Sequence, residues 1–216
     1  NVLVFVLLAV SAVTLTSCGG NDDKFKVGLI CLHDESSTYD KNFIDSMYRA
    51  IEQLGLSEDQ LELVTGIGED NTCYEKATEL AQTCDIIFAD SFGHEDYMIQ
   101  AAQENEDVWF CHSTGTKAHT KNLDNYFNAF ASIYEGRYLA GIVAGMKLNE
   151  MINNGDITPE QAVMGYVGAF PYAEVVSGYT SFYLGAKSVC PTVTMKVRYT
   201  SSWYDFDKEK SAAEAL

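Results

Sequence analysis

Carboxylate, hydroxyl and imidazole side chains occur in short segments, and each segment follows an apolar run of strand length. These polar segments are 33–40 (HDESSTYD), 66–69 (GIGE), 90–94 (DSFGH) and 112–116 (HSTGT). Two later segments, 168–172 (GAFPY) and 200–204 (TSSWY), carry aromatic rings. Carboxylates accept hydrogen bonds from hydroxyl groups, and aromatic rings stack on flat ligands. The combination favours a neutral or cationic ligand with hydroxyl groups and a flat ring. The absence of arginine from these segments argues against phosphate or carboxylate ligands.

Several of these residues have an ordinary structural interpretation beside the functional one. Asp34 and Asp40 flank the predicted start of a helix, where aspartate commonly caps the backbone. Phe170 is equally compatible with a core position, and Trp203 lies among polar residues just after a predicted strand. The candidate ligand-binding residues in these segments are Asp34, Tyr39, Asp40, Asp90, Ser91, His94, Thr114, Phe170 and Trp203.

The sequence offers little for catalysis or metal binding. Its four histidines have no metal-ligand spacing, and no CxxC pair, GxSxG or P-loop occurs. Gly66 and Gly68 lack the third glycine of a dinucleotide fingerprint, because Asn71 stands at that position. Cys111 and His112 are the one adjacent nucleophile–base pair, and neighbours on a strand point to opposite faces. No metal or cofactor is predicted, and an exported hydrolase is kept as an alternative function.

Strands must alternate with helices to place these segments together. Parallel βαβ units are predicted, and the carboxyl ends of their strands form the edge at which open sheets bind ligands. A first lobe is expected at residues 25–130, and a long helix followed by a partial second lobe at 131–216. The glycines of GIVAG (141–145) predict close packing of that helix. The predicted strands are 26–32, 61–65, 85–89, 108–111, 126–131, 164–167 and 193–199, and the predicted helices are 39–54, 71–83, 96–105, 132–149, 173–188 and 205–216.

The overall composition limits the classes of partner. The chain has 216 residues, of which 47% are hydrophobic, and its formal net charge is −17. It is long and apolar enough to bury a core, so a disordered chain is excluded. The negative charge repels nucleic acid phosphates and anionic lipid, so neither is expected as a partner.

The first residues have the pattern of an export signal. Residues 2–13 form an apolar run too short to span a membrane, and LTSC at 15–18 follows it. This pattern resembles a bacterial lipobox, so residues 1–17 are expected to be a signal peptide lacking its start. Cys18 is the expected lipidation site, and residues 18–24 are a tether. The protein would then lie on the extracytoplasmic face of the cell membrane, held through the lipid anchor alone. No disulfide is predicted among the other five cysteines.

Several segments together resemble one family. They are KVGLI (26–30), YDKNF (39–43), CDIIFAD (84–90), YEGRYLAG (134–141), YVGAFP (166–171), LGAKSV (184–189) and WYD (203–205). With the lipobox, this set is similar to the basic membrane protein family of substrate-binding lipoproteins, which includes purine nucleoside receptors of ABC transporters. The resemblance covers residues 15–216.

The resemblance implies a type I periplasmic-binding fold of two lobes that close on a ligand, with an ABC permease as partner. Nucleoside binders of this family hold the purine between aromatic rings and the ribose with carboxylates and a lysine. Asp40, Asn42 and Phe43 match the first-loop motif, Glu135 matches a glutamate at the start of the long helix, and Phe170 is the candidate stacking ring of lobe two. Residues 33–38 depart from the shorter, Asp-rich loop of many members.

Two further expectations concern the whole chain. Lobe two has two clear predicted strands, and the last helix is predicted to run on at Leu216. The chain is therefore expected to be a fragment that cannot close on a ligand alone. A ligand-sensing regulator is a second alternative, because the same fold also serves transcription factors, but the export signal and the negative charge oppose it.

Overall fold

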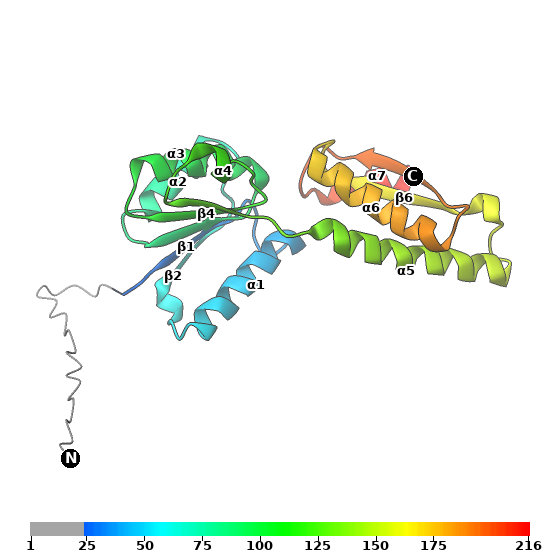
Figure 1. Ribbon diagram of the computed structural model, residues 1–216, viewed down its shortest axis with the longest axis horizontal. Coiled ribbons are helices and arrows are strands. Elements are labelled where there is room, and N and C mark those ends of the chain that lie inside the picture. Colours follow the sequence, from blue (N-terminus) through cyan, green and yellow to red (C-terminus); the bar gives the residue numbers. More distant parts are fainter. Residues whose placement is uncertain (1–23) are drawn as a thin grey trace, which may run out of the picture.

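The computed structural model describes residues 24–216 and shows two α/β lobes side by side (Figure 1). The predicted signal peptide, Cys18 and most of the predicted tether lie outside the described residues. Within these residues the chain passes from the first lobe to the second once, through the short connection 130–132. The predicted boundary between residues 130 and 131 falls in this connection.

Lobe one is built on a parallel sheet of five strands in the order β2-β1-β3-β4-β5. The register pairs Val27 of β1 with Leu61 of β2 on one side and with Ile86 of β3 on the other. Its elements are β1 (Val27–Ile30), α1 (Thr38–Gln53), β2 (Leu61–Val64), α2 (Asn71–Leu80), β3 (Ile86–Ala89), α3 (Glu95–Glu104), β4 (Trp109–Ser113), α4 (Ala118–Lys121) and β5 (Tyr126–Ala129).

Helices cover both faces of this sheet, and that is why β1 is buried at every residue. The larger core lies between the sheet and α2 and α3, and it includes Ile30, Ile87 and Phe110. A smaller core lies under α1, where Ile44 packs with Leu29 and Cys31. Because all strands are parallel, their carboxyl ends meet at one edge of the sheet, next to lobe two.

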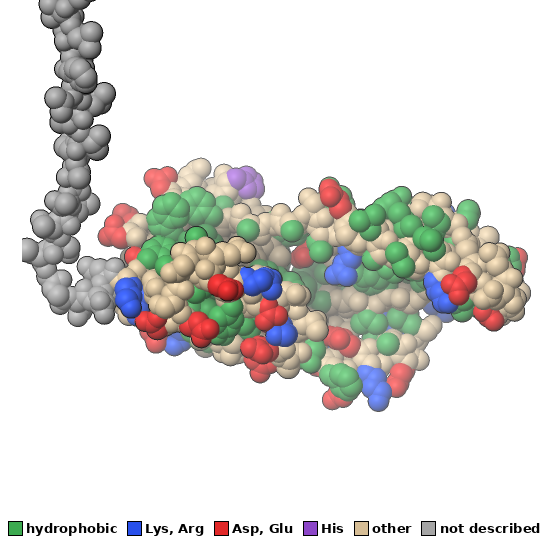
Figure 2. Space-filling view, turned by 90° about the horizontal axis from the view of Figure 1, so that it is seen from below, with side chains coloured by type: hydrophobic (Ala, Val, Ile, Leu, Met, Phe, Trp, Pro, Cys, Tyr) green, Lys and Arg blue, Asp and Glu red, His purple; other side chains and the backbone are tan. Residues whose placement is uncertain are grey.

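Lobe two consists of a long helix, two parallel strands and two further helices. Its elements are α5 (Ile133–Asn154), β6 (Val163–Gly168), α6 (Ala173–Val189), β7 (Thr194–Tyr199) and α7 (Phe206–Glu214). The strands pair in register from Val163 with Thr194 to Gly168 with Tyr199. Figure 2 shows several groups of exposed apolar side chains over the right-hand lobe. Three apolar residues of α5 remain largely exposed: Leu139 (64%), Val143 (66%) and Met146 (60%).

The backbones of α5 and α6 touch at glycines. A Cβ atom on Gly141 would lie 2.0 Å from the Phe182 carbonyl oxygen, and one on Gly145 would lie 2.5 Å from that of Ala186. On the opposite helix, a Cβ on Gly185 would lie 2.0 Å from the Tyr138 oxygen. Close packing predicted from the GIVAG segment is therefore confirmed. Among the described residues, no helix combines the length and apolarity that a membrane crossing requires.

Every predicted strand and helix is present, with boundaries that shift by up to five residues. The one-turn helix α4 was not predicted, because four residues carry no helical periodicity. Helix α5 runs to Asn154, and there Gly155 ends it in the left-handed conformation with φ of 79°. The prediction that the last helix continues at Leu216 was wrong, since α7 ends at Glu214. The five cysteines of the described residues are free thiols.

Candidate ligand-binding cavity between the lobes

A cavity of about 480 Å³ lies between the two lobes and is lined by both. Its volume lies in the usual range for small-molecule sites, roughly 300–1,000 Å³. Lobe one contributes residues that follow β1, β3 and β4, together with the start of α1. Lobe two contributes the end of β6, the first two turns of α5 and α6, and the loop after β7. The lining residues are Leu32, His33, Ser37–Asp40, Asn42, Ser91, Phe92, Thr114, Ile133, Arg137, Tyr166–Ala169, Glu174, Val175, Gly178, Trp203 and Tyr204.

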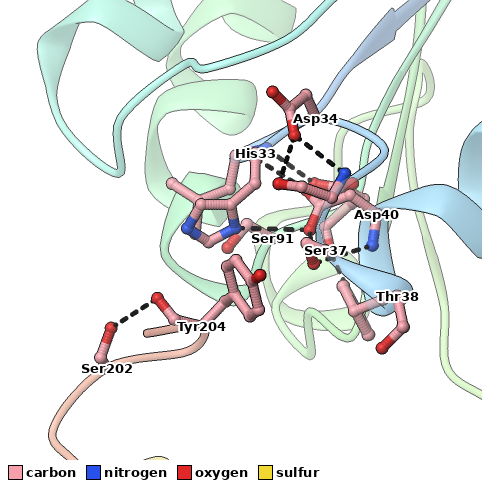
Figure 3. A network of polar contacts seen from close by, with 12 residues as sticks. His33, Asp34, Ser37, Thr38, Asp40, Ser91, Ser202 and Tyr204 are labelled. Carbon is pink, nitrogen blue, oxygen red and sulfur yellow. Dashed lines mark hydrogen bonds and ion pairs between the residues drawn. The ribbon is translucent and has the colours of Figure 1, made fainter. Parts of the chain in front are cut away.

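The start of α1 forms a polar wall of the cavity (Figure 3). Ser37 is the N-cap of α1, and its hydroxyl donates to Asp40 Oδ2 at 2.5 Å. The His33 amide donates to Asp40 Oδ1 at 2.8 Å, and His33 Nδ1 lies 3.3 Å from Asp40 Oδ2. Asp40 is thus held in one orientation by three groups of the loop after β1. The ring of His33 also meets the ring of Tyr204 edge-on across the cleft, with centroids 5.7 Å apart.

A second carboxyl group lies behind Asp40. One oxygen each of Asp40 and Asp90, together with Cys31 Sγ, all lie within 4.8 Å of one another, and all three residues are buried. Burial raises the pKa of Asp90 to about 7, and the nearby charge of Asp40 adds to this shift. Burial would also raise the pKa of Asp40, but hydrogen bonds from Ser37 and the His33 amide hold it below its usual value.

The two carboxyl groups therefore have different charges near neutral pH. Asp40 is ionised and accepts hydrogen bonds at the cavity wall, whereas Asp90 holds a proton for part of the time. Among the described residues, Asp90 Oδ2 has no hydrogen-bond partner. A proton on Asp90 removes that deficit, because it supplies a donor facing the Asp40 carboxylate. Burial keeps the Cys31 thiol protonated by raising its pKa far above the ordinary value. A metal ion would have to displace both protons from this cluster.

Tyr39 presents an anchored aromatic ring to the cavity. Its hydroxyl donates to the Asp90 carbonyl oxygen at 2.9 Å, while the residue as a whole remains 46% exposed. Phe43 packs on the far side of the Tyr39 ring with centroids 5.1 Å apart. The ring is therefore fixed at both ends before any ligand arrives, and this lowers the entropy cost of stacking on it.

Polar side chains bond to the loops that carry Ser91 and Thr114 and hold these two residues in place. His112 Nε2 donates to the Ser91 carbonyl oxygen at 2.6 Å, and the Ser91 hydroxyl donates to Glu69 at 2.5 Å. Thr114 takes the left-handed conformation with φ of 66°, and the buried Glu95 carboxylate accepts from two amides that follow it, those of Thr116 and Lys117. Burial lowers the pKa of His112 to about 4, so its ring is neutral.

The lobe-two wall carries two charged side chains, Arg137 of α5 and Glu174 of α6. Burial raises the pKa of Glu174 above its usual value, and the positive charge of Arg137 opposes this shift. Sequence reasoning considered the loops at strand ends and missed both residues, because they lie within helical turns. Arginine is absent from the strand-end segments, but Arg137 of α5 lines the cavity, so that absence no longer argues against an anionic ligand. The sequence feature that could have pointed to Arg137 is the four-residue spacing of Ile133, Arg137 and Gly141, which puts all three on one face of α5.

Four aromatic rings gather at the cavity rim and connect the lobes. Phe92 of lobe one lies 5.6 Å from Tyr172 and 6.2 Å from Trp203, centroid to centroid. Phe170 stacks on Tyr172 at 5.0 Å with an angle of 11° between the rings. The spacing of Phe92 and Trp203 leaves no room for a ring between them, because a stacked sandwich needs roughly twice 3.5 Å.

The structure brings half of the predicted site residues to the cavity. Three of the others point elsewhere for simple geometric reasons. Asp34 is exposed and accepts hydrogen bonds from the amide and hydroxyl of Ser36. Phe43 lies behind Tyr39, and Glu135 is two helical residues from Arg137, on roughly the opposite face of α5. The predicted residues that line the cavity are Tyr39, Asp40, Asn42, Ser91, Thr114 and Trp203.

The remaining three are buried or belong to the rim. Asp90 lies beneath Asp40, and its Oδ1 accepts from the Leu32 amide at 3.2 Å. His94 is fully buried, and its Nε2 donates to the Ile67 carbonyl oxygen at 2.9 Å. Phe170 packs against Tyr172 and Trp203 outside the cavity lining.

The adjacent Cys111 and His112 do not form a nucleophile–base pair. Successive residues of β4 point to opposite faces of the sheet, and His112 Nε2 is bonded to Ser91. Burial raises the pKa of Cys111 to about 11, so its thiol is protonated at neutral pH. This pair gives the hydrolase alternative no support.

Comparisons with known proteins agree with this architecture. Residues 27–216 match the family described as "ABC transporter substrate-binding protein PnrA-like". A purine-binding protein of Brucella abortus is 33% identical over 217 residues, covering 98% of this chain and 56% of that protein. A putative ABC transporter glucose-binding protein of Haloferax volcanii is 39% identical over 132 residues, covering 61% of this chain and 30% of that protein. The chain thus spans about half the length of the first relative and less of the second.

A solved structure shows the shared fold. The solute-binding protein of an ABC transporter system from Aeropyrum pernix K1 superposes with a TM-score of 0.73 at 16% sequence identity. The superposition covers 89% of this chain and 52% of that one. The predicted α/β periplasmic-binding fold is therefore confirmed.

Proposed function

Because the chain belongs to the PnrA-like family of ABC transporter substrate-binding proteins, we propose that it binds a purine nucleoside between its lobes and delivers it to an ABC permease. The observation that carries this proposal is the composition of the cavity. It combines the anchored Tyr39 ring and the Trp203 indole with hydrogen-bonding groups of Asp40, Asn42 and Ser91. A flat base suits the rings, and ribose hydroxyls suit the carboxylate. The Brucella abortus relative is named for purine binding.

The charges of the cavity support an uncharged ligand. Asp40 and Glu174 contribute negative charge to the wall, and Arg137 contributes one positive charge. A phosphorylated or dicarboxylate ligand would meet repulsion from both carboxylates. Polar atoms in the wall are satisfied best by a ligand with several donors and acceptors and no net charge.

A sugar is the second candidate ligand, because the Haloferax volcanii relative is named as a putative glucose-binding protein. Carboxylates beside aromatic rings also suit a pyranose, whose hydroxyls donate and whose apolar face packs on rings. A purine fits better, because the cavity also holds Arg137, which can donate to ring nitrogens and a base carbonyl. We assign the protein no enzymatic activity, since transfer of a ligand to a permease needs none.

The identity of the bound compound tests the proposal. The full-length gene product would be purified under native conditions, and its ligand released and identified by mass spectrometry. A purine nucleoside at near-stoichiometric amount supports the proposal. A monosaccharide in its place would favour the second candidate.

The same proposal includes a lipid anchor at Cys18. Replacing Cys18 with Ala removes the thiol that would be acylated, and the neighbouring Ser17→Ala variant is the matched control. Radiolabelled palmitate should enter the wild type and Ser17→Ala but not Cys18→Ala, and only Cys18→Ala should leave the membrane fraction. Membrane retention of an unlabelled Cys18→Ala protein would rule out this anchor.

A further inference from the structure

Thr114 is held in a backbone conformation that β-branched residues rarely adopt. Its φ is 66°, in the left-handed region, where the Cβ atom crowds the following carbonyl oxygen. Among residues 24–216, the other non-glycine residues with positive φ are Asn122 and Ser201, and neither lines the cavity. Residues in such strained conformations cluster at ligand-binding sites, so Thr114 is a candidate for a specific role in binding.

The chain on both sides of Thr114 explains why the strain persists. Before the turn, the Thr114 amide extends the pairing of β4 with β5 by a hydrogen bond of 3.0 Å. After the turn, Glu95 Oε1 accepts from the two amides that follow Gly115, at 2.7 and 2.8 Å. Gly115 itself packs so closely that a Cβ atom there would collide with the His112 ring and the Glu95 carboxylate. These contacts fix the backbone before and after Thr114, and the left-handed turn falls on the threonine.

The Thr114 hydroxyl is enclosed, and among the described residues it has no hydrogen-bond partner. It lies beside the hydroxyl of Tyr39, which donates to the Asp90 carbonyl oxygen at 2.9 Å. Burial raises the pKa of Tyr39, and the Thr114 hydroxyl acts against this shift, as a donor near the phenol oxygen does. The phenol oxygen keeps an acceptor site while it donates to Asp90. A small rotation of either side chain would join Thr114, Tyr39 and Asp90 in a chain of two hydrogen bonds.

An enclosed hydroxyl without a partner is unfavourable, and so is the strained backbone that carries it. We propose that Thr114 is a positioning residue for ligand binding, whose left-handed backbone holds its hydroxyl against the Tyr39 hydroxyl. The Tyr39 ring is then held by Asp90, Phe43 and Thr114 together. A ring held at a third point loses less freedom when a base stacks on it, so the Thr114 hydroxyl contributes to affinity. This inference rests on the proposed purine function.

Variants of the full-length gene product test the inference by thermal unfolding and by calorimetry, with whichever of inosine and adenosine the wild type binds more tightly. Thr114→Gly removes the strain and the hydroxyl together. It should raise the unfolding midpoint by about 1–4 °C and weaken nucleoside binding about three- to tenfold. Thr114→Ser keeps the hydroxyl and should bind within about twofold of the wild type. Asn122→Gly relaxes a left-handed residue outside the cavity lining, so as the matched control it should leave the affinity unchanged.

A double-mutant cycle with Tyr39→Phe distinguishes positioning from direct contact with the ligand. Thr114→Val should weaken nucleoside binding about three- to tenfold in the wild type and have little effect in the Tyr39→Phe background. An equal loss in both backgrounds would overturn the positioning role, and so would wild-type affinity in Thr114→Val and Thr114→Gly. An unchanged or lower midpoint for Thr114→Gly would overturn the strain. If the wild type binds neither nucleoside, the proposed function is overturned, and this inference with it.

Discussion

In this site the charge of Asp40 affects the protonation state of the neighbouring Asp90. Three groups of the loop after β1 hold Asp40 ionised, and its charge, with burial, keeps a proton on Asp90. The proton in turn lets Asp90 lie beside Asp40 without repulsion. The preorganised carboxylate at the cavity wall thus depends on a residue that does not line it.

The raised pKa of Asp90 makes a specific prediction about stability. Between about pH 4 and 7 the folded chain keeps a proton that the unfolded chain has lost, so this residue destabilises the fold progressively as the pH rises. Asp90→Asn has no such proton to lose. We expect it to be more stable than the wild type by about 1–3 kcal/mol at pH 8, with the difference shrinking toward pH 4.

Urea unfolding across this pH range measures the difference. The exposed Asp107→Asn variant is the control, and it should differ from the wild type by a nearly constant amount. A pH-independent difference for Asp90→Asn would show that Asp90 is already ionised in the folded chain at low pH.

The aromatic rings of the cavity make a second prediction at the same scale. Tyr39→Ala or Trp203→Ala should weaken nucleoside binding by about 1–3 kcal/mol, the usual value of base stacking on a ring. Tyr39→Phe should lose less, because it keeps the ring and loses only the bond to the Asp90 carbonyl. Trp109→Ala is the control, since that exposed ring lies at the other end of β4. If calorimetry shows no loss of nucleoside affinity in either Ala variant, the two rings do not stack on the base.

Asp40, Ser91 and Thr114 could be predicted as cavity residues from the sequence. Each lies in a polar segment after a predicted strand, and the carboxyl ends of parallel strands share one edge of the sheet. The same reasoning could not separate Asp40, which lines the cavity, from Asp90 directly behind it. That distinction depends on which carboxylate receives the amides and hydroxyls of the loop, and this is a tertiary property. Arg137 and Glu174 were missed because a helix face becomes a cavity wall only when another lobe lies opposite.

At the scale of elements, the contact between α5 and α6 organises lobe two. The glycines allow the two backbones to touch, so side chains added there would force the helices apart. Gly141→Ala should destabilise the folded protein by about 1–3 kcal/mol, even though alanine favours a helix over glycine. Gly136→Ala is the matched control in the same helix, where a Cβ would meet no atom within 4 Å, and it should be neutral or stabilising. Thermal unfolding compares the two, and equal midpoints would contradict the close contact.

Element positions were predictable where the apolar pattern is clear, as in the continuous apolar run of β1 and the helical spacing of apolar residues in α1. The end of α5 was placed five residues early, although Met151 and Ile152 continue the apolar residues of the helix and Gly155 marks its stop. Helix α4 has four residues and ends at Asn122 in the left-handed conformation with φ of 50°. Such a single turn is set by the loop around it, so no periodic signal predicts it.

At the scale of the whole molecule, the site exists because two lobes face each other. The connection 130–132 brings the start of α5 opposite the start of α1, and the rim aromatics bridge the two sides. Lobe one provides the Asp40 carboxylate and the hydroxyls of Ser91 and Thr114, and lobe two provides Arg137, Glu174 and Trp203. Neither lobe alone holds the full set of contacts, so binding and the relative position of the lobes must be coupled.

The most direct test of this account is titration calorimetry of the full-length gene product with inosine and, separately, with glucose. The composition of the cavity predicts saturable binding of inosine with one site per chain and no measurable heat from glucose. Weaker inosine binding in Tyr39→Ala, but not in Trp109→Ala, should place the ligand in the cavity between the lobes. Saturable binding of glucose without binding of inosine would contradict the account.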